Sequence, residues 1–150
     1  MEVPMKTDWH DYLALFGRIF IAAIFFMSGI NKILAPGATQ EMMAQAGMPL
    51  PGLFLVGAIV LEIGGALSLL FGAFTFWGSL ALLIFMIPTT LIFHTNFADP
   101  NQMIHFMKNL AMIGGILYVM GAGPGRISVD AKRKPESYRR TEADARRRAA

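Results

Sequence analysis

The sequence predicts an all-α membrane protein built as an antiparallel bundle of four transmembrane helices. Of its 150 residues, 55 % are hydrophobic and 15 % are charged, whereas a soluble domain has about 45–50 % and about 25 %. Four apolar segments each approach the roughly 20 residues that a helix needs to cross the hydrocarbon core. Short polar breaks separate these segments, which favours a single up-and-down bundle.

The predicted spans run from about Tyr12 to Leu34, from Leu53 to Phe71, from about Phe74 to Phe93, and from about Met103 to Met120. The fourth is the weakest, because it must include Lys108 to be long enough. No cleavage site follows the first span, so we expect it to remain as an anchor.

The connections also carry structural signals. Gly72-Ala73 is short enough to make the flanking spans antiparallel neighbours. The segment 39–46 lies between Pro36-Gly37 and Gly47-Met48-Pro49, so we expect a short interfacial helix that stops at Gly47.

The charges predict that both termini lie in the cytoplasm. Residues 126–150 hold nine of the thirteen Lys and Arg residues, and the positive-inside rule places such a segment on the cytoplasmic side. We therefore expect a cytoplasmic N-terminal segment (1–11), a four-helix transmembrane domain (12–125) and a basic cytoplasmic tail (126–150). The tail either binds anionic lipid or acts only as a topology determinant.

The composition argues against several classes of protein. The basic excess is confined to one tail and does not cover a folded surface, so we expect no nucleic-acid partner. The absence of cysteine excludes disulfides, a thiol redox pair and Cys-ligated metal. His94 and His105 have only Asp99 to join them, so no metal site is predicted. The eleven methionines are typical of packing.

Glu62 is the most informative ionisable residue. A charge near mid-membrane costs about 2.5–3.5 kcal/mol, so it marks a functional hypothesis and needs a partner. Glu62 lies near the middle of the second span and shares one helical face with four apolar, mostly small residues, namely Ala58, Gly65, Ala66 and Leu69. This face is expected to pack against another helix.

Arg18 is the first choice of partner for Glu62, and Lys108 is the second. Arg18 and Lys32 share one face of the first span, about 21 Å apart by helix rise. The depth of Arg18 is close to that of Glu62, so a bidentate pair is expected. Alternatively, Arg18 extends to the interface, or the pair serves packing alone, and Lys32 is an interfacial anchor.

His94 closes the third span one turn after Thr90, beyond a kink expected at Pro88. A polar strip is predicted from the kink to the outer mouth, where Lys32 is also expected. His94 is then a candidate proton donor or acceptor for a bound ligand. The alternative is a histidine that only faces the interface.

An ordered set of motifs over roughly residues 12–130 resembles the DoxX family, also grouped with DoxD-like membrane subunits. The set comprises Gly17-Arg18, Ser28-Gly29 with Lys32, Gly47-Met48-Pro49, Glu62-Ile63-Gly64-Gly65, His94, Lys108-Asn109-Leu110-Ala111 with Gly114-Gly115, and the stretch from Gly123 to Asp130. The resemblance implies a bacterial or archaeal four-helix membrane protein. It also implies associations found in some members: quinone-linked thiosulfate oxidation, or an oxidoreductase complex with a superoxide dismutase and a sulfurtransferase.

Two hypotheses for function follow. In the first, the chain is a quinone-interacting or redox-complex-associated subunit of the bacterial inner membrane, with quinone as cofactor and a redox protein as partner. Its site draws on Arg18, Lys32, Glu62, His94 and Lys108, with Glu62, Arg18 and His94 as catalytic candidates. In the second, the chain is a non-enzymatic scaffold or a small-solute carrier, whose cations attract an anion. Catalysis and homo-oligomerisation stay open.

Overall fold

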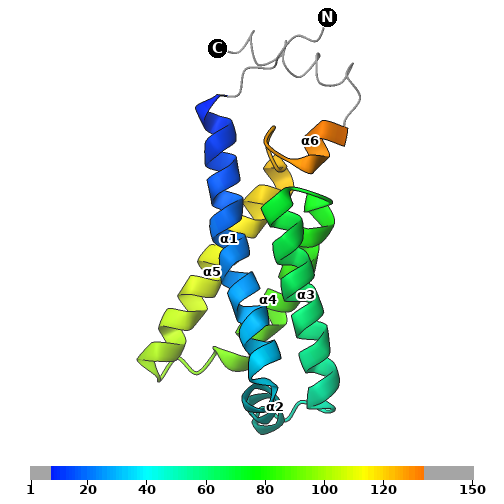
Figure 1. Cartoon of the computed structure of the whole chain (residues 1–150). Helices are drawn as coiled ribbons and strands as arrows, with labels where there is room; N and C mark the ends of the chain where they lie inside the picture. Colours follow the sequence, from blue (N-terminus) through cyan, green and yellow to red (C-terminus); the bar gives the residue numbers. More distant parts are fainter. Residues whose placement is uncertain (1–7, 134–150) are drawn as a thin grey trace, which may run out of the picture.

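The computed structural model describes residues 8–133, and its long elements are all helices (Figure 1). In chain order they are α1 (Trp9–Leu34), α2 (Pro36–Gln45), α3 (Pro51–Phe71), α4 (Thr75–Phe93), α5 (Pro100–Ala122) and α6 (Val129–Arg133). Helices α1, α3, α4 and α5 are long and apolar enough to cross a membrane, and residues 8–133 contain no strand. The predicted all-α fold with four spans is confirmed.

The first span begins before the apolar run does. The Asp8 carboxylate accepts a hydrogen bond from the backbone N–H of His10, and the Asp11 carboxylate accepts one from the backbone N–H of Asp8. This reciprocal capping box starts α1 at Trp9 rather than near Tyr12.

The fourth span also starts earlier than predicted. The Asp99 side chain accepts a hydrogen bond from the backbone N–H of Asn101, and Pro100 occupies the first helical position. Proline is favoured there because its missing N–H would have no partner in the helix. The helix therefore gains a turn ahead of Met103.

The chain reverses tightly between α3 and α4, as predicted. Gly72 adopts a left-handed conformation with φ of 62°, and the N–H of Ala73 donates to the carbonyl of Ser68 at 3.0 Å. This is the pattern of a Schellman motif, in which glycine tolerates the positive φ.

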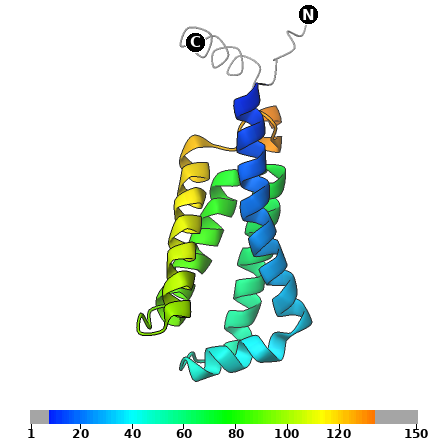
Figure 2. The same ribbon diagram turned by 90° about the vertical axis from the view of Figure 1, so that its left-hand side faces the viewer.

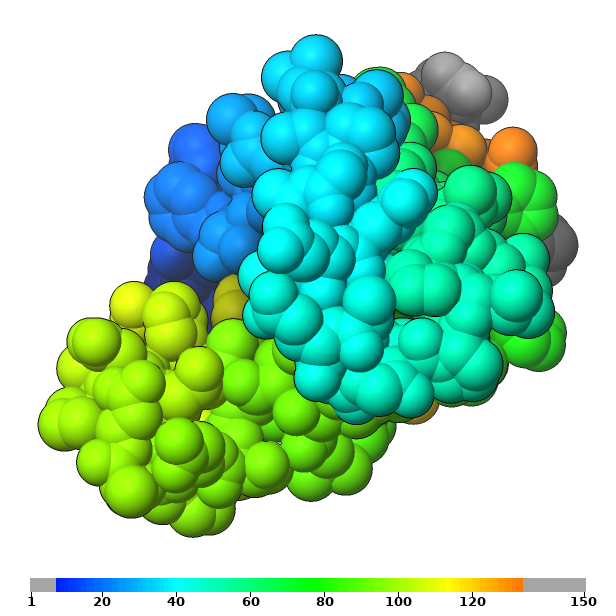
Figure 3. Space-filling view, turned by 90° about the horizontal axis from the view of Figure 1, so that it is seen from below, coloured from blue at the N-terminus to red at the C-terminus, as the bar shows by residue number. Residues whose placement is uncertain are grey.

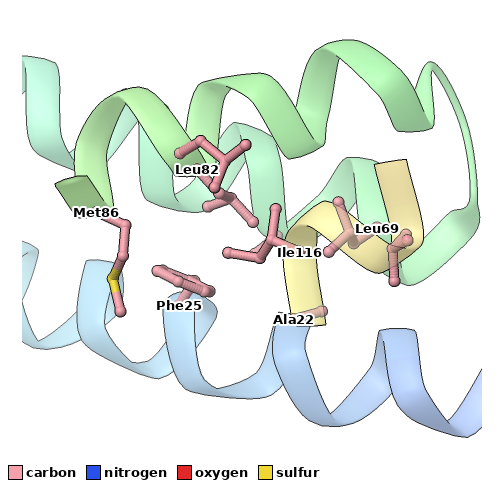
Figure 4. Packing of buried hydrophobic residues seen from close by; sticks show 9 residues of the cluster. Ala22, Phe25, Leu69, Leu82, Met86 and Ile116 are labelled. Atoms are coloured by element: carbon pink, nitrogen blue, oxygen red, sulfur yellow. The ribbon is translucent and has the colours of Figure 1, made fainter. Parts of the chain in front are cut away.

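Helix α3 lies at the centre of the bundle, with α1 on one side and α4 on the other, while α5 packs mainly on α4. The predicted face of α3 is buried, from Ala58 through Glu62 to Leu69. All four long helices contribute to the main core. Figure 4 shows its central side chains pointing toward one another: Ala22, Phe25, Leu69, Leu82, Met86 and Ile116.

At one end of the bundle, α2 lies across α1 and α3 (Figures 1 and 3). It buries Met43 against Leu55 and Ala58 of α3. A helix was predicted here, and it ends before Gly47, which has a positive φ. Its location at the membrane interface stays a prediction. Helix α5 diverges from α1 toward this end, as Figures 1 and 2 both show.

At the opposite end, residues 123–133, called here the strap, run from the end of α5 to the α3–α4 turn (Figure 1). The N–H of Asp130 donates to the carbonyl of Gly72 at 2.8 Å. Residues 126–133 of the predicted basic tail are thus packed on the bundle, and residues 134–150 lie outside the described range. Below, the two ends of the bundle are named the α2 end and the strap end.

Candidate functional site

A buried ion pair joins Lys32 of α1 to Glu62 of α3. The Lys32 Nζ atom donates a hydrogen bond to Glu62 Oε1 at 3.0 Å and to Ser28 Oγ at 2.8 Å. It also lies 3.0 Å from Glu62 Oε2, an atom that has no hydrogen bond among the described residues. The glutamate side chain is 1 % exposed and the lysine side chain 16 %, so the lysine is the accessible member of the pair.

Glycine makes this pairing geometrically possible. A Cβ atom placed on Gly29 would lie 2.6 Å from Ile63 Cδ1 and 3.5 Å from Glu62 Cβ. The absence of a side chain therefore lets α1 approach α3 at the level of Glu62. Lys32 lies one turn further along the same face of α1, and its side chain reaches back to the carboxylate.

Helix α4 also contributes to the site, beside α1 and α3. The Lys32 Nζ atom lies 5.4 Å from the ring centroid of Phe85, a cation–π contact. Phe85 also packs edge-on against Phe25 of α1, with the ring centroids 6.4 Å apart. The ion pair is thus bordered by the Phe85 ring, which Phe25 holds in place.

The predicted pair of Arg18 with Glu62 is wrong. Arg18 is 1 % exposed and donates from Nη1 to the carbonyl of Leu69 at 2.9 Å and from Nη2 to the carbonyl of Ile127 at 2.6 Å. The sequence prediction measured the depth of Arg18 and of Glu62 from the predicted ends of their spans, and it assumed that these ends lie at the same height in the membrane. Arg18 instead lies beside the last turns of α3, and its side chain extends toward the N-terminal end of α1, away from Glu62.

Lys108, the second choice of partner, is not at the site either. Its side chain is exposed and forms no hydrogen bond or ion pair with any residue from 8 to 133. The neighbouring Asn109 faces inward, where its Nδ2 donates to Thr90 Oγ1 of α4 at 3.0 Å. Adjacent helical residues point about 100° apart, so Lys108 faces away from that contact.

His94 lies in a separate polar cluster at the α2 end. Its Nδ1 is 2.9 Å from Gln102 Oε1, and its ring stacks on His105 with centroids 5.1 Å apart. The hydroxyl of Thr90 donates to the carbonyl of Met86. No contact joins His94 to Lys32 within residues 8–133, so of the five candidate site residues only Lys32 and Glu62 come together. The kink at Pro88 stays a prediction, and α4 continues past it to Phe93.

The strap end holds polar contacts that the sequence reading missed. Asp130 Oδ1 accepts from the backbone N–H of Phe74 at 2.8 Å, and its Oδ2 accepts from the N–H and the hydroxyl of Thr75 at 2.9 and 2.8 Å. Asp130 therefore caps α4 from another part of the chain. Burial raises its pKa, but the hydrogen bonds from Thr75 and Phe74, together with nearby Arg133, outweigh this and hold the pKa below its ordinary value.

The comparisons with known proteins agree with this architecture. The DoxX family model matches residues 13–95. Inner membrane protein YqjF of Escherichia coli (strain K12) is 38 % identical over 120 residues, covering 80 % of this chain and 91 % of the relative. Inner membrane protein YphA of the same organism is 32 % identical over 125 residues, covering 80 % and 89 %. No solved structure matches the chain. With its four apolar helices, the chain is a multi-pass inner membrane protein and belongs to the DoxX family.

Proposed function

We propose that this chain is a membrane subunit that binds a quinone beside Lys32 and Glu62 and works with a redox partner protein. The observation that supports the proposal is the buried Lys32–Glu62 pair, whose lysine keeps a partly open side. A charged pair inside a membrane bundle is costly to maintain and commonly marks a ligand or proton pathway.

The residues present fit the chemical needs of a quinone. A quinone requires an apolar surface, a hydrogen-bond donor for a carbonyl oxygen and a group that exchanges protons. An ammonium group has three N–H donors, and Lys32 uses two of them, on Ser28 and Glu62. The Nζ atom also lies 3.0 Å from Glu62 Oε2, but the lysine side chain is 16 % exposed, so a quinone carbonyl can approach the ammonium group. Phe85 supplies apolar surface beside it.

Each residue then has a defined role. A bound quinone supplies two-electron, two-proton redox chemistry. Lys32 donates a hydrogen bond to a quinone carbonyl, and Ser28 holds the ammonium group in place. Glu62, a carboxylate in the resting ion pair, takes up and releases a proton at Oε2, the oxygen that has no hydrogen bond among the described residues. In this proposal the electrons are delivered or removed by a redox partner protein or by a diffusing donor.

The test is to extract the protein in native lipid discs and to measure quinone per protein by mass spectrometry. Lys32→Gln is expected to lower retained quinone at least tenfold, because it removes the donor. Lys108→Gln is the matched control, since Lys108 is an exposed cation that has no partner among the described residues. The double variant Lys32→Gln/Glu62→Gln leaves no unpaired buried charge, so it is expected to fold and still lose quinone.

Two outcomes contradict the proposal: wild-type discs that contain no more quinone than discs without the protein, or equal losses in the Lys32 and Lys108 variants. Discs that contain phospholipid alone would favour the second hypothesis, a scaffold or a carrier of small anions. The same partly exposed ammonium group of Lys32 supports an anion carrier, so binding of thiosulfate that depends on Lys32 would identify it.

A further inference from the structure

The aromatic residues with a polar edge gather at the strap end. Within residues 8–133, every Trp and Tyr lies there: Trp9 and Tyr12 in the first turn of α1, Trp77 in the first turn of α4, and Tyr118 in the last two turns of α5. All four are at least half exposed. Such residues concentrate where the membrane meets water, which favours a position for this end at the level of the lipid headgroups.

The strap holds cations at that same level. The three hydrogen bonds of Asp130 fix α6 against the start of α4. The Arg133 guanidinium consequently lies 4.6 Å from the ring centroid of Phe74, and Lys132 beside it is exposed. Phe74 is itself exposed and lies one turn before Trp77. Two cations and two large aromatic rings therefore share one small region.

Among residues 8–133, the acidic groups near this region already accept hydrogen bonds. Asp130 caps α4, Asp11 is 3 % exposed and accepts from the N–H of Arg126 at 3.3 Å, and Asp8 caps α1. The α2 end differs, because Lys32 there is paired with Glu62, while Glu41 and Asp99 offset the exposed Lys108 in the first half of α5. The strap end is thus the end whose charge suits an anionic surface.

We propose that the strap end binds anionic phospholipid headgroups, with Lys132 and Arg133 contacting the phosphate and with Phe74 and Trp77 lying against the glycerol and upper acyl chains. The site differs from the Lys32–Glu62 site in ligand and in position. Its chemistry is recognition of a phosphate by cations that the strap holds next to an aromatic surface.

The test uses the full chain with Trp9→Phe, which leaves Trp77 as the one tryptophan. Fluorescence of Trp77 is quenched in vesicles that contain brominated phosphatidylglycerol or, at the same mole fraction, brominated phosphatidylcholine. The ratio of the two quenching efficiencies reports lipid preference around Trp77. We expect a ratio above one, and Lys132→Gln or Arg133→Gln is each expected to bring it closer to one, because each cation contributes up to about a fivefold preference for anionic lipid. Arg133→Lys keeps the charge and is expected to keep the preference.

Lys108→Gln is the control for general loss of a positive charge, and it is expected to leave the ratio unchanged. A ratio of one in the parent protein, or an equal fall with Lys108→Gln, overturns the proposal. Inorganic phosphate that abolishes the preference, compared with chloride at equal ionic strength, identifies free phosphate as the ligand instead. Lys132 has no described side-chain contact, so its variant keeps the test decisive if an Arg133 variant fails to fold.

Discussion

Two cations on one face of α1 have different roles because a helical side chain extends toward the N-terminus of its own helix. Lys32 therefore reaches from the α2 end back into the bundle, where it meets Glu62. Arg18 reaches toward the strap end, where it meets two backbone carbonyls. The same physical rule thus places Lys32 at the candidate site and places Arg18 where it joins α1 to the end of α3 and to the strap.

The sequence identified Glu62 and both cations but assigned the wrong pair. Counting residues from the ends of apolar runs gives depth only if the helices are level, and the caps on α1 and α5 lie outside those runs. Side-chain direction and the four-residue spacing of Ser28 and Lys32 were the signals that favoured Lys32. The contacts of Asp130 with Thr75 and of Arg18 with Ile127 link segments 55 and 109 residues apart, which one sequence cannot pair.

Gly72→Ala is expected to lower the free energy of unfolding by about 1–3 kcal/mol. Gly72 has a positive φ, and a Cβ there would collide with Arg18 Nη1 and Ser128 Cβ. Gly64→Ala is the control on the same helix, because a Cβ at Gly64 meets nothing within 4 Å and alanine favours helix. Thermal unfolding in detergent compares them, and equal midpoints would contradict this interpretation.

At the scale of elements, the helices start where a carboxylate satisfies their first N–H groups. Asp8 and Asp99 cap their helices from the preceding residue, so hydropathy alone predicted those spans to within a turn. Helix α4 has no side-chain cap of its own at Phe74 and depends on Asp130 from α6. Helix α6 has only five residues, and periodicity does not reveal so short an element.

Asp130→Asn is expected to reduce stability by about 0.5–2 kcal/mol at neutral pH. An amide has one carbonyl oxygen, whereas the two carboxylate oxygens together accept from Phe74 and Thr75. Because the folded pKa of Asp130 lies below its ordinary value of 3.8, its stabilisation is full above that value and is lost as the pH falls through the folded pKa.

Unfolding midpoints measured from pH 7 down to pH 3 test this expectation. The gap between wild type and Asp130→Asn should narrow toward the acid end. Asp99→Asn is the matched control, because a single amide oxygen can replace the one hydrogen bond that Asp99 accepts from Asn101, so its gap should be small throughout. A gap for Asp130→Asn that is constant with pH would show that the carboxylate charge is not what stabilises the cap.

For the whole molecule, the length of the apolar segments and the shortness of the connections between them determine the four-helix fold, and the sequence predicted it. The divergence of α5 from α1 toward the α2 end was not predicted (Figure 2), because it depends on how side chains fill the space between helices. Gly115 is a point of close approach between these helices, where a Cβ would lie 3.2 Å from Ile21 Cδ1.

The strap end is proposed to face the cytoplasm, following the positive-inside rule. The chain has no cysteine, so single cysteines report orientation without background. In intact spheroplasts, a membrane-impermeant maleimide is expected to label an Ala38→Cys variant and to spare an Ala150→Cys variant. Permeabilised spheroplasts, in which both variants should react, provide the control. Labelling of the Ala150→Cys variant in intact spheroplasts would show that the strap end faces the periplasm instead.

The strap also determines the order in which the structure can be completed. Ribosomes make α4 before residue 130, so its first N–H groups lack their carboxylate acceptor until Asp130 has been synthesised. Arg18 likewise enters the bundle with only one of its two carbonyl acceptors, since Ile127 is made 109 residues later. The strap, which is made after all four spans, therefore secures both the first helix and the turn between the second and third spans. These contacts can form only after all four spans have been synthesised.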